Sequence, residues 1–176
     1  MTVLPRPESG RPYRVAVVCL GNICRSPMAD VVLNDRVAAA GLGDLVEVES
    51  FGTGGWHAGN PMDVRAAATL TAAGYDATRH RARQFTRSTT GHDLVLAMDA
   101  SNHSDLADLG VAGDRLLLFR SFDPSPDDDS VPDPYYGGDE GFAHVLDIVE
   151  RASDALVEQL RALLDRRDAD REEVGQ

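Results

Sequence analysis

Residues 19–27 have the sequence CLGNICRSP and lie between an apolar run at residues 15–18 and a helix-like run at residues 28–40. A short apolar run that ends in a Gly-Asn loop before Ser-Pro predicts a strand, a tight turn and a helix start. Ser26 suits the helix N-cap, and Pro27 suits the first helical position. The loop would wrap backbone N–H groups around one point at the positive end of a helix dipole, which predicts an anion cradle.

Two side chains give this cradle its chemistry. Cys19 places a thiol at its floor, and the planar guanidinium of Arg25 can hold two oxygens of a bound oxyanion. A lone cysteine at a strand end is usually a small buried hydrophobe. Here the Gly-Asn turn, Arg25 and the Ser-Pro start converge on one geometry. A nucleophile built into a phosphate cradle indicates covalent phosphoryl transfer.

The rest of the chain alternates between strand and helix patterns. Apolar runs predict strands at residues 14–18, 45–50, 93–98 and 115–119, and helical patterns occupy residues 27–40, 61–74, 101–109 and 142–164. This order predicts a three-layer α/β fold, in which a four-stranded parallel sheet carries helices on both faces. Ligands then bind at the carboxyl ends of the strands, where the loop after the first strand lies.

The length of 176 residues indicates one domain, and the polarity of both ends of the chain indicates flexible termini. We expect a flexible leader at residues 1–12, a single domain at residues 13–164, and a charged, disordered tail at residues 165–176.

The composition limits the classes of binding partner and the cellular compartments in which the protein is expected. A net charge of −12 argues against nucleic acid and anionic membranes as partners, and no apolar stretch approaches the ~20 residues that span a bilayer. The N-terminus lacks the apolar core of a secretory signal. Two cysteines in a chain with a reactive thiol indicate a reducing compartment. We therefore expect a cytoplasmic protein, with export without a recognisable signal left open.

A second chemical feature lies in the long loop at residues 120–141. Prolines flank Asp133, and Tyr135 and Tyr136 follow. The alternative for such a segment is a solvated acidic linker, which we accept for residues 127–129 only. A carboxyl group held rigidly over the cradle would protonate a departing oxygen, and a tyrosine beside it would offer a flat face to an aromatic leaving group.

Together these motifs are specific to one family. The pattern Cys-x5-Arg-Ser with Gly-Asn inside it, followed late in the chain by Asp-Pro-Tyr-Tyr-Gly at residues 133–137, resembles the bacterial type of low-molecular-weight protein tyrosine phosphatase. The segments at residues 50–57, 80–84 and 98–102 agree, so that the resemblance covers residues 13–164. It implies a sheet in the flavodoxin-like strand order 2-1-3-4.

The resemblance also implies a mechanism. Cys19 would attack phosphorus as a thiolate, Arg25 would clamp the phosphoryl oxygens, and Asp133 would act first as general acid and then as general base. Asp99 would form an ion pair with Arg25, although an N-cap carboxylate before a helix is nearly as good an interpretation. The implied substrates are phosphotyrosine-containing proteins, with phosphate and other oxyanions as competitive inhibitors. No metal or cofactor is expected, and the protein would be a monomer or weak dimer.

Further residues are implied to support the loop or to bind the substrate. In the family the loop Asn takes a strained conformation, which here falls on Asn22, with Ser26, Ser50 and His80 in the positions that support it. His80 could instead be a surface histidine. Trp56 and Tyr135 match positions that wall the pocket. The full substrate-binding set is Leu20, Gly21, Asn22, Ile23, Cys24, Trp56, Tyr135 and Tyr136. Cys24 could trap an oxidised Cys19 as a disulfide, or could be an inert buried thiol.

Three other activities are compatible with the cradle alone. Arsenate reductases of this fold relay oxidation through additional cysteines, which this chain lacks. Protein arginine phosphatases commonly carry a threonine where this chain has Ile23. An inactive phosphotyrosine-binding module would not require Cys19, Arg25 and Asp133 together. Phe51 departs from the usual Ser-Ala-Gly-Thr of relatives and bears on substrate preference. We also expect the acidic residues 127–129, 139 and 140 to disfavour acidic phosphopeptides.

Overall fold

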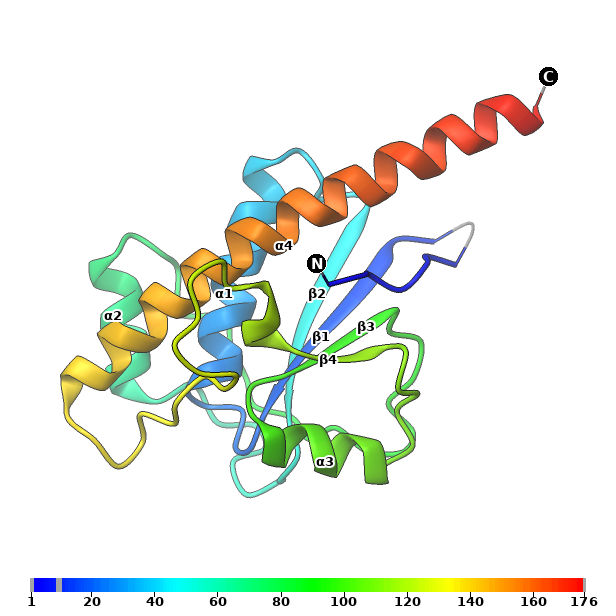
Figure 1. The fold of residues 1–176 in the computed structure, drawn as a ribbon. Helices are drawn as coiled ribbons and strands as arrows, with labels where there is room; N and C mark the ends of the chain where they lie inside the picture. The colour runs from blue at the N-terminus through cyan, green and yellow to red at the C-terminus, as the bar shows by residue number, and fades with distance from the viewer. Residues whose placement is uncertain (1, 9–10, 176) are drawn as a thin grey trace.

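The sheet of this chain has four parallel strands in the order β2-β1-β3-β4, as expected. The computed structural model describes residues 2–8 and 11–175 (Figure 1). The strands are β1 (Tyr13–Cys19), β2 (Val46–Gly52), β3 (Leu94–Ala97) and β4 (Leu116–Leu118). The helices are α1 (Arg25–Ala39), α2 (Val64–Ala72), α3 (Ala100–Asp108) and α4 (Asp139–Val174), with the short 3-10 helix η1 (Phe119–Phe122) after β4.

Strand β1 is central, because it pairs with β2 on one side and with β3 on the other. A strand that is covered on both edges and both faces has a continuous apolar sequence, which explains the run at residues 15–18. Val15 and Val17 pack into the larger core, whereas Ala16 and Val18 belong to the smaller cluster on the opposite face. This alternation follows from the two-residue period of a strand.

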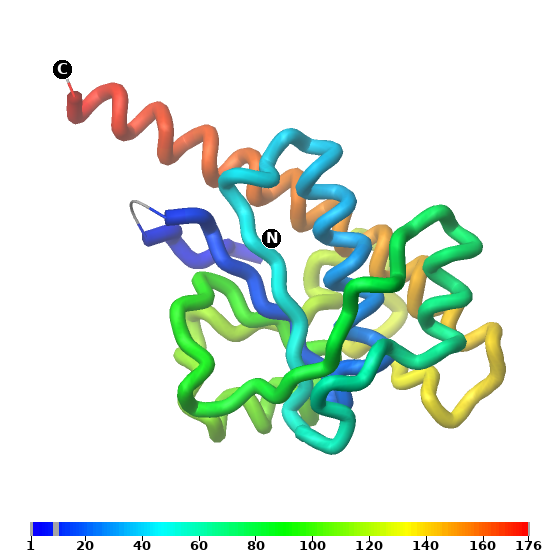
Figure 2. The backbone as a smooth tube through the Cα atoms, turned by 180° about the vertical axis from the view of Figure 1, so that it is seen from behind, coloured from blue at the N-terminus to red at the C-terminus, as the bar shows by residue number. Residues whose placement is uncertain are grey.

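The helices form the two outer layers. The larger core is built from β1 together with α1, α2 and α4, and the smaller one from the other face of the sheet and Leu106 of α3. Figure 1 shows α4 crossing the molecule beside α1 and α2, while α3 lies on the other side of the sheet. The reverse view shows α4 continuing past the body of the fold toward the C-terminus (Figure 2).

The last helix ends later than the sequence pattern placed it. Helix α4 continues to Val174, although the sequence pattern placed its end at residue 164 and predicted a disordered tail after it. Polar composition prevents burial but not helix formation, and a helix already formed by packing extends at little cost through residues that are good helix formers. In the leader, Leu4 packs on the core, and the Tyr13 hydroxyl donates to Pro5 O at 3.0 Å.

The predicted leader and tail also include residues 1, 9, 10 and 176, which lie outside the described residues. None of the helices seen in residues 2–8 and 11–175 combines the length and the apolar character needed to cross a membrane.

Candidate active site

The loop that follows β1 carries a single strained residue. Residues 19–26 are called the anion loop here; they run from the last residue of β1 into the first turn of α1. Asn22 has a φ of 56°, and among the described residues it is the only non-glycine residue with a positive φ. Asparagine tolerates the left-handed conformation better than most residues, but the unfavourable free energy of this conformation must be offset by surrounding contacts.

Hydrogen bonds of the Asn22 side chain stabilise this backbone conformation. Its amide nitrogen donates to Ser26 Oγ at 2.8 Å and to Ser50 Oγ at 3.1 Å, and its Oδ1 accepts from the Arg83 N–H at 2.9 Å. His80 Nε2 lies 2.6 Å from the carbonyl oxygen of Asn22. Burial lowers the pKa of His80, so that the imidazole is neutral near pH 7 and its Nε2–H donates to this carbonyl. The structure thus places Ser26, Ser50 and His80, the three residues predicted to support Asn22, in contact with it.

The end of strand β2 and the loop that follows it fix the anion loop from the side. Thr53 N–H and Gly54 N–H donate to the carbonyl oxygens of Cys19 and Leu20, each at 2.9 Å. A Cβ on Gly52 would lie 2.8 Å from Leu20 O and 3.1 Å from Asn22 N. Only glycine lets the two backbones approach this closely.

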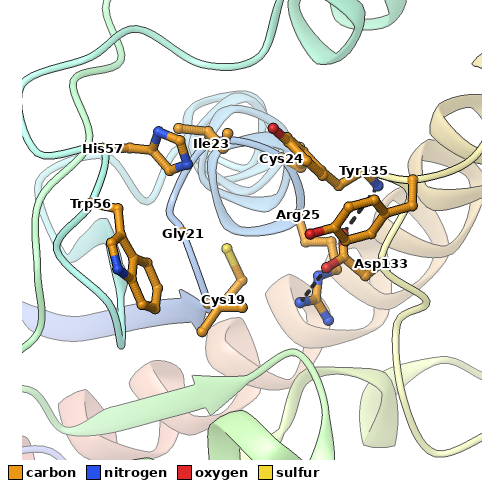
Figure 3. A pocket seen from close by; sticks show the side chains of 11 residues that line it. Cys19, Gly21, Ile23, Cys24, Arg25, Trp56, His57, Asp133 and Tyr135 are labelled. Atoms are coloured by element: carbon orange, nitrogen blue, oxygen red, sulfur yellow. Dashed lines mark hydrogen bonds and ion pairs between the residues drawn. The ribbon is translucent and has the colours of Figure 1, made fainter.

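The expected capping by Ser26 does not occur. Helix α1 begins at Arg25 with Cys24 as N-cap, and no side chain caps it. The Ser26 hydroxyl instead contacts Cys19 Sγ at 3.0 Å and donates to Phe51 O at 3.2 Å. Because Asn22 and Cys19 already occupy this hydroxyl, it is a support for the loop and the thiol rather than a cap. Figure 3 shows the Cys19 side chain in the middle of the pocket.

Arg25 is held at one edge of the pocket by two hydrogen bonds and one longer ion pair. Its Nη1 donates to Asp99 Oδ2 at 2.6 Å and to Val131 O at 3.1 Å, and its Nη2 lies 3.7 Å from Asp133 Oδ2. Burial opposes the charge of this 3% exposed residue, but Cys19, Asp99 and Asp133 outweigh it and raise the pKa of Arg25. The guanidinium is therefore a fixed positive charge beside the thiol.

Asp99 fills both roles that were considered for it. Its Oδ2 accepts from Arg25, while its Oδ1 accepts from Asn102 N–H at 2.7 Å and caps α3. The two oxygens of one carboxylate point at different partners. The ion pair thereby ties the anion loop to the helix on the far face of the sheet.

Asp133 belongs to the long loop before α4. It lies near Nη2 of the Arg25 guanidinium, whereas Asp99 contacts Nη1. Its Oδ1 accepts from Tyr135 N–H at 3.1 Å, and its side chain is 40% exposed. Arg65 of α2 donates to Tyr135 O at 3.1 Å, and its guanidinium lies 5.6 Å from the Tyr135 ring centroid. Arg65, which no sequence motif singled out, therefore fixes the loop that carries Asp133.

These groups surround a pocket of about 290 Å³. Trp56 and Tyr135 lie on opposite sides of Cys19 (Figure 3). The lining comprises Cys19, Leu20, Gly21, Ile23, Cys24, Arg25, Trp56, His57, Asp133, Tyr135 and Tyr136. Asn22 is 1% exposed and does not line the pocket, so the structure places it among the supports instead.

His57 is a lining residue that the sequence motifs did not reveal. Its ring carbon Cδ2 would lie 3.2 Å from a Cβ on Gly21, so the glycine leaves room for the imidazole. Only its place next to Trp56 could have drawn attention to it. Arg83 was also missed, because a backbone N–H leaves no mark in the sequence.

Cys24 lines the same pocket as Cys19. Burial, with the nearby Asp63 carboxylate, raises the pKa of the Cys24 thiol to about 12. Both cysteines are free. A thiol that stays protonated at neutral pH is a poor nucleophile.

Comparison with known proteins identifies the relatives of this site. The family model for low molecular weight phosphotyrosine protein phosphatase matches residues 14–166. The chain belongs to the low molecular weight phosphotyrosine protein phosphatase family. A low molecular weight protein-tyrosine-phosphatase of Streptomyces coelicolor is 47% identical over 163 residues, which are 89% of this chain and 99% of the relative.

Solved structures of the phosphatase family share the fold. YfkJ from Bacillus subtilis superposes with a TM-score of 0.82 at 31% identity, covering 88% of this chain and 98% of that one. An arginine phosphatase from Drosophila gives a TM-score of 0.75 at 27% identity, covering 83% and 96%. The fold therefore does not by itself distinguish phosphotyrosine from phosphoarginine.

Proposed function

We propose that this chain hydrolyses phosphotyrosine in proteins through a phosphocysteine on Cys19. The observation that carries the proposal is the placement of a thiol, a fixed guanidinium and a carboxyl group around one pocket between two aromatic side chains. Membership of the phosphatase family and the names of the relatives support it.

In the first step Cys19 Sγ attacks phosphorus as a thiolate. An S–P bond forms, the bond from phosphorus to the tyrosyl oxygen breaks, and the departing oxygen takes a proton from the Asp133 carboxyl group. Arg25 stabilises the charge that spreads over the phosphoryl oxygens. The Ser26 hydroxyl, 3.0 Å from Sγ, can turn its proton from Phe51 O toward the thiolate when Cys19 becomes the leaving group in the second step.

In the second step water hydrolyses the phosphocysteine. Asp133, now ionised, takes a proton from the attacking water, the S–P bond breaks, and inorganic phosphate leaves. The exposed position of Asp133 gives water access to it. Protons and electrons balance over the two steps without a further reactant.

The walls of the pocket favour an aromatic ring. Trp56 and Tyr135 face each other across Cys19, so a phenyl ring between them makes contact on both sides (Figure 3). The side chains of phosphoserine and phosphothreonine lack such a ring and are too short to bring their phosphate to the thiol from the rim.

The test is hydrolysis of a phosphotyrosine peptide by wild type, Cys19→Ser and Asp133→Asn. We expect Cys19→Ser to be inactive. Asp133→Asn should lose most activity toward a phenyl phosphate and less toward esters of more acidic phenols, which leave without a proton. Retained activity in Cys19→Ser would refute the mechanism. Higher kcat/KM for phosphoarginine than for phosphotyrosine would assign the chain to the arginine phosphatase branch instead.

Three further expectations belong to the same proposal. Phosphate and related oxyanions should inhibit competitively, because they occupy the anion loop. The reactive thiol fits a cytoplasmic enzyme. We also expect a monomer or weak dimer, which light scattering at two concentrations would test.

A further inference from the structure

A second hollow lies directly beside the active-site pocket. It has a volume of about 560 Å³ and is bounded by the loop after β2, by Gln84 and Arg87, and by the α3 residues Asp105 and Asp108. Leu20 and Trp56 line both this hollow and the pocket above Cys19. These two side chains therefore form a ridge between the hollows.

The ridge is apolar, exposed and held in place. Trp56 is 73% exposed and Leu20 is 44% exposed. A Cβ on Gly54 would lie 1.8 Å from the Trp56 ring, so the ring rests directly against the backbone of this glycine. An aromatic side chain packed on backbone keeps its position without being covered by other side chains, which leaves its outer face available to a substrate.

The ridge gives a protein substrate one route away from the pocket. When a phosphotyrosine side chain enters the pocket, its backbone stays at the rim. An extended chain advances about 3.3–3.6 Å per residue, and the two hollows share Leu20 and Trp56 as a wall, so that a residue near the phosphotyrosine in sequence can lie over the second hollow. The hollow is thus placed to receive a side chain that flanks the phosphotyrosine.

The charges in the hollow select the kind of side chain. Asp105 and Asp108 are three residues apart on α3, on one face of the helix, and both are exposed. Neither carboxylate forms an ion pair with any residue that the structure describes. They also lie toward the C-terminal end of α3, where the helix dipole is negative.

Arg87 partly offsets these charges. Its guanidinium donates to the carbonyl oxygen of Asp108 at 3.0 Å, at the same helix end. One arginine against two carboxylates and a helix C-terminus leaves the hollow negative. A cation is therefore favoured there.

We propose that this hollow is a substrate subsite that binds a lysine or arginine near the phosphotyrosine. The inference rests on the proposed function and adds Asp105, Asp108 and Arg87 as specificity-determining residues. It also assigns the preference against acidic peptides to Asp105 and Asp108 instead of residues 127–129. Asp127 is bound to Arg120, and none of these residues lines the pocket or the hollow.

The test compares two phosphotyrosine peptides that differ only in carrying lysines or glutamates on both sides of the phosphotyrosine. Wild type should give the higher kcat/KM with the lysine peptide. An exposed ion pair contributes about 0.2–1 kcal/mol, so the double variant Asp105→Asn/Asp108→Asn should lower the lysine-to-glutamate ratio by about 1.5- to 5-fold per carboxylate. Arg87→Gln should change the ratio in the opposite direction.

Two controls separate this subsite from the overall charge of the protein. The double variant Asp44→Asn/Asp114→Asn removes the same charge at exposed positions outside the hollow and should keep the wild-type ratio. A small aryl phosphate, which has no flanking residues, should be hydrolysed equally by wild type and by Asp105→Asn/Asp108→Asn. The peptide preference should also shrink as salt is raised.

The inference would be overturned by equal ratios in the two double variants or by a wild-type preference for the glutamate peptide. If wild type fails to hydrolyse the aryl phosphate, the proposed function itself is wrong. Hydrolysis of the aryl phosphate without any effect of Asp105, Asp108 and Arg87 would leave the function intact and remove only the subsite.

Discussion

Asn22 gives the sharpest test of how the anion loop is held. Its backbone adopts a φ of 56°, and its side chain makes three hydrogen bonds of 2.8–3.1 Å inside the protein. Two substitutions separate these contributions. Asn22→Gly keeps a residue that accepts the positive φ but removes all three bonds, whereas Asn22→Ala removes the bonds and adds backbone strain.

The size of each effect follows from typical magnitudes. A buried hydrogen bond contributes about 1 kcal/mol net. The loss of three therefore destabilises the loop conformation that binds phosphate by about 3 kcal/mol relative to other conformations of the loop. At 1.4 kcal/mol per factor of ten, Asn22→Gly should lower kcat/KM by about 100-fold. A left-handed alanine costs about 1 kcal/mol more than glycine, which adds a further loss of about fivefold in Asn22→Ala.

Two assays report on this loop. One is kcat/KM for an aryl phosphate. The other is phosphate affinity measured by intrinsic fluorescence, because the single tryptophan, Trp56, lines the pocket. Both should fall together, and a thermal unfolding curve shows whether the fold survives.

Wild-type activity and phosphate affinity in Asn22→Ala would refute the reasoning, since the loop would then not depend on these bonds. Equal activities of the glycine and alanine variants would refute the role of backbone strain only.

Three further predictions concern separate features. Gly52→Ala should lower phosphate affinity about tenfold or more, because its Cβ would lie 2.8–3.1 Å from three backbone atoms, whereas Gly43→Ala, with no heavy atom within 4 Å, should leave affinity unchanged. At pH 7, iodoacetamide should label Cys19 and not Cys24, since burial raises the pKa of Cys24 to about 12; mass spectrometry that finds Cys24 labelled would contradict this. Burial raises the pKa of Asp30 from 3.8 to about 6, so wild type should lose up to about 3 kcal/mol of stability relative to Asp30→Asn as pH rises from 4 to 7. Equal slopes of the unfolding free energy against pH in the two proteins would exclude that effect.

The sign of the Asp30 prediction follows from proton binding. Between pH 3.8 and about 6 the folded protein holds a proton on Asp30 that the unfolded chain has released. Stability is therefore greatest below this window and falls as the pH rises through it. The amide introduced by Asp30→Asn cannot titrate, which makes this variant a reference for the same site.

Much of the fold could be predicted from local sequence. The buried central strand, the Gly-Asn turn and the start of α1 occupy consecutive residues, so their order alone predicts an anion loop at the carboxyl end of a parallel strand. The predicted end of the last helix was wrong, because the loss of the apolar stripe after residue 164 was taken for the end of the helix. The residues after 164 extend α4, because helix formation depends on backbone continuity as much as on burial.

The supports of the site were only partly predictable. Ser50 and His80 were named through the family resemblance, not from their own surroundings in the sequence. The guanidinium of Arg65 donates to the backbone carbonyl of the distant Tyr135, and the backbone N–H of Arg83 donates to the side chain of the distant Asn22. Such contacts leave no pattern, because any residue supplies the same backbone groups.

The sequence by itself determined the chemistry of this protein: a thiol, a guanidinium and a carboxyl group in the motifs of one phosphatase family. Tertiary structure alone decided how these groups are aimed and what surrounds them. The Asp99 carboxylate is divided between Arg25 and a helix cap, and Trp56 becomes a ridge between two hollows. The reason is physical, since reactive groups are set by residue type, whereas orientation and substrate preference depend on contacts between segments that the chain brings together only by folding.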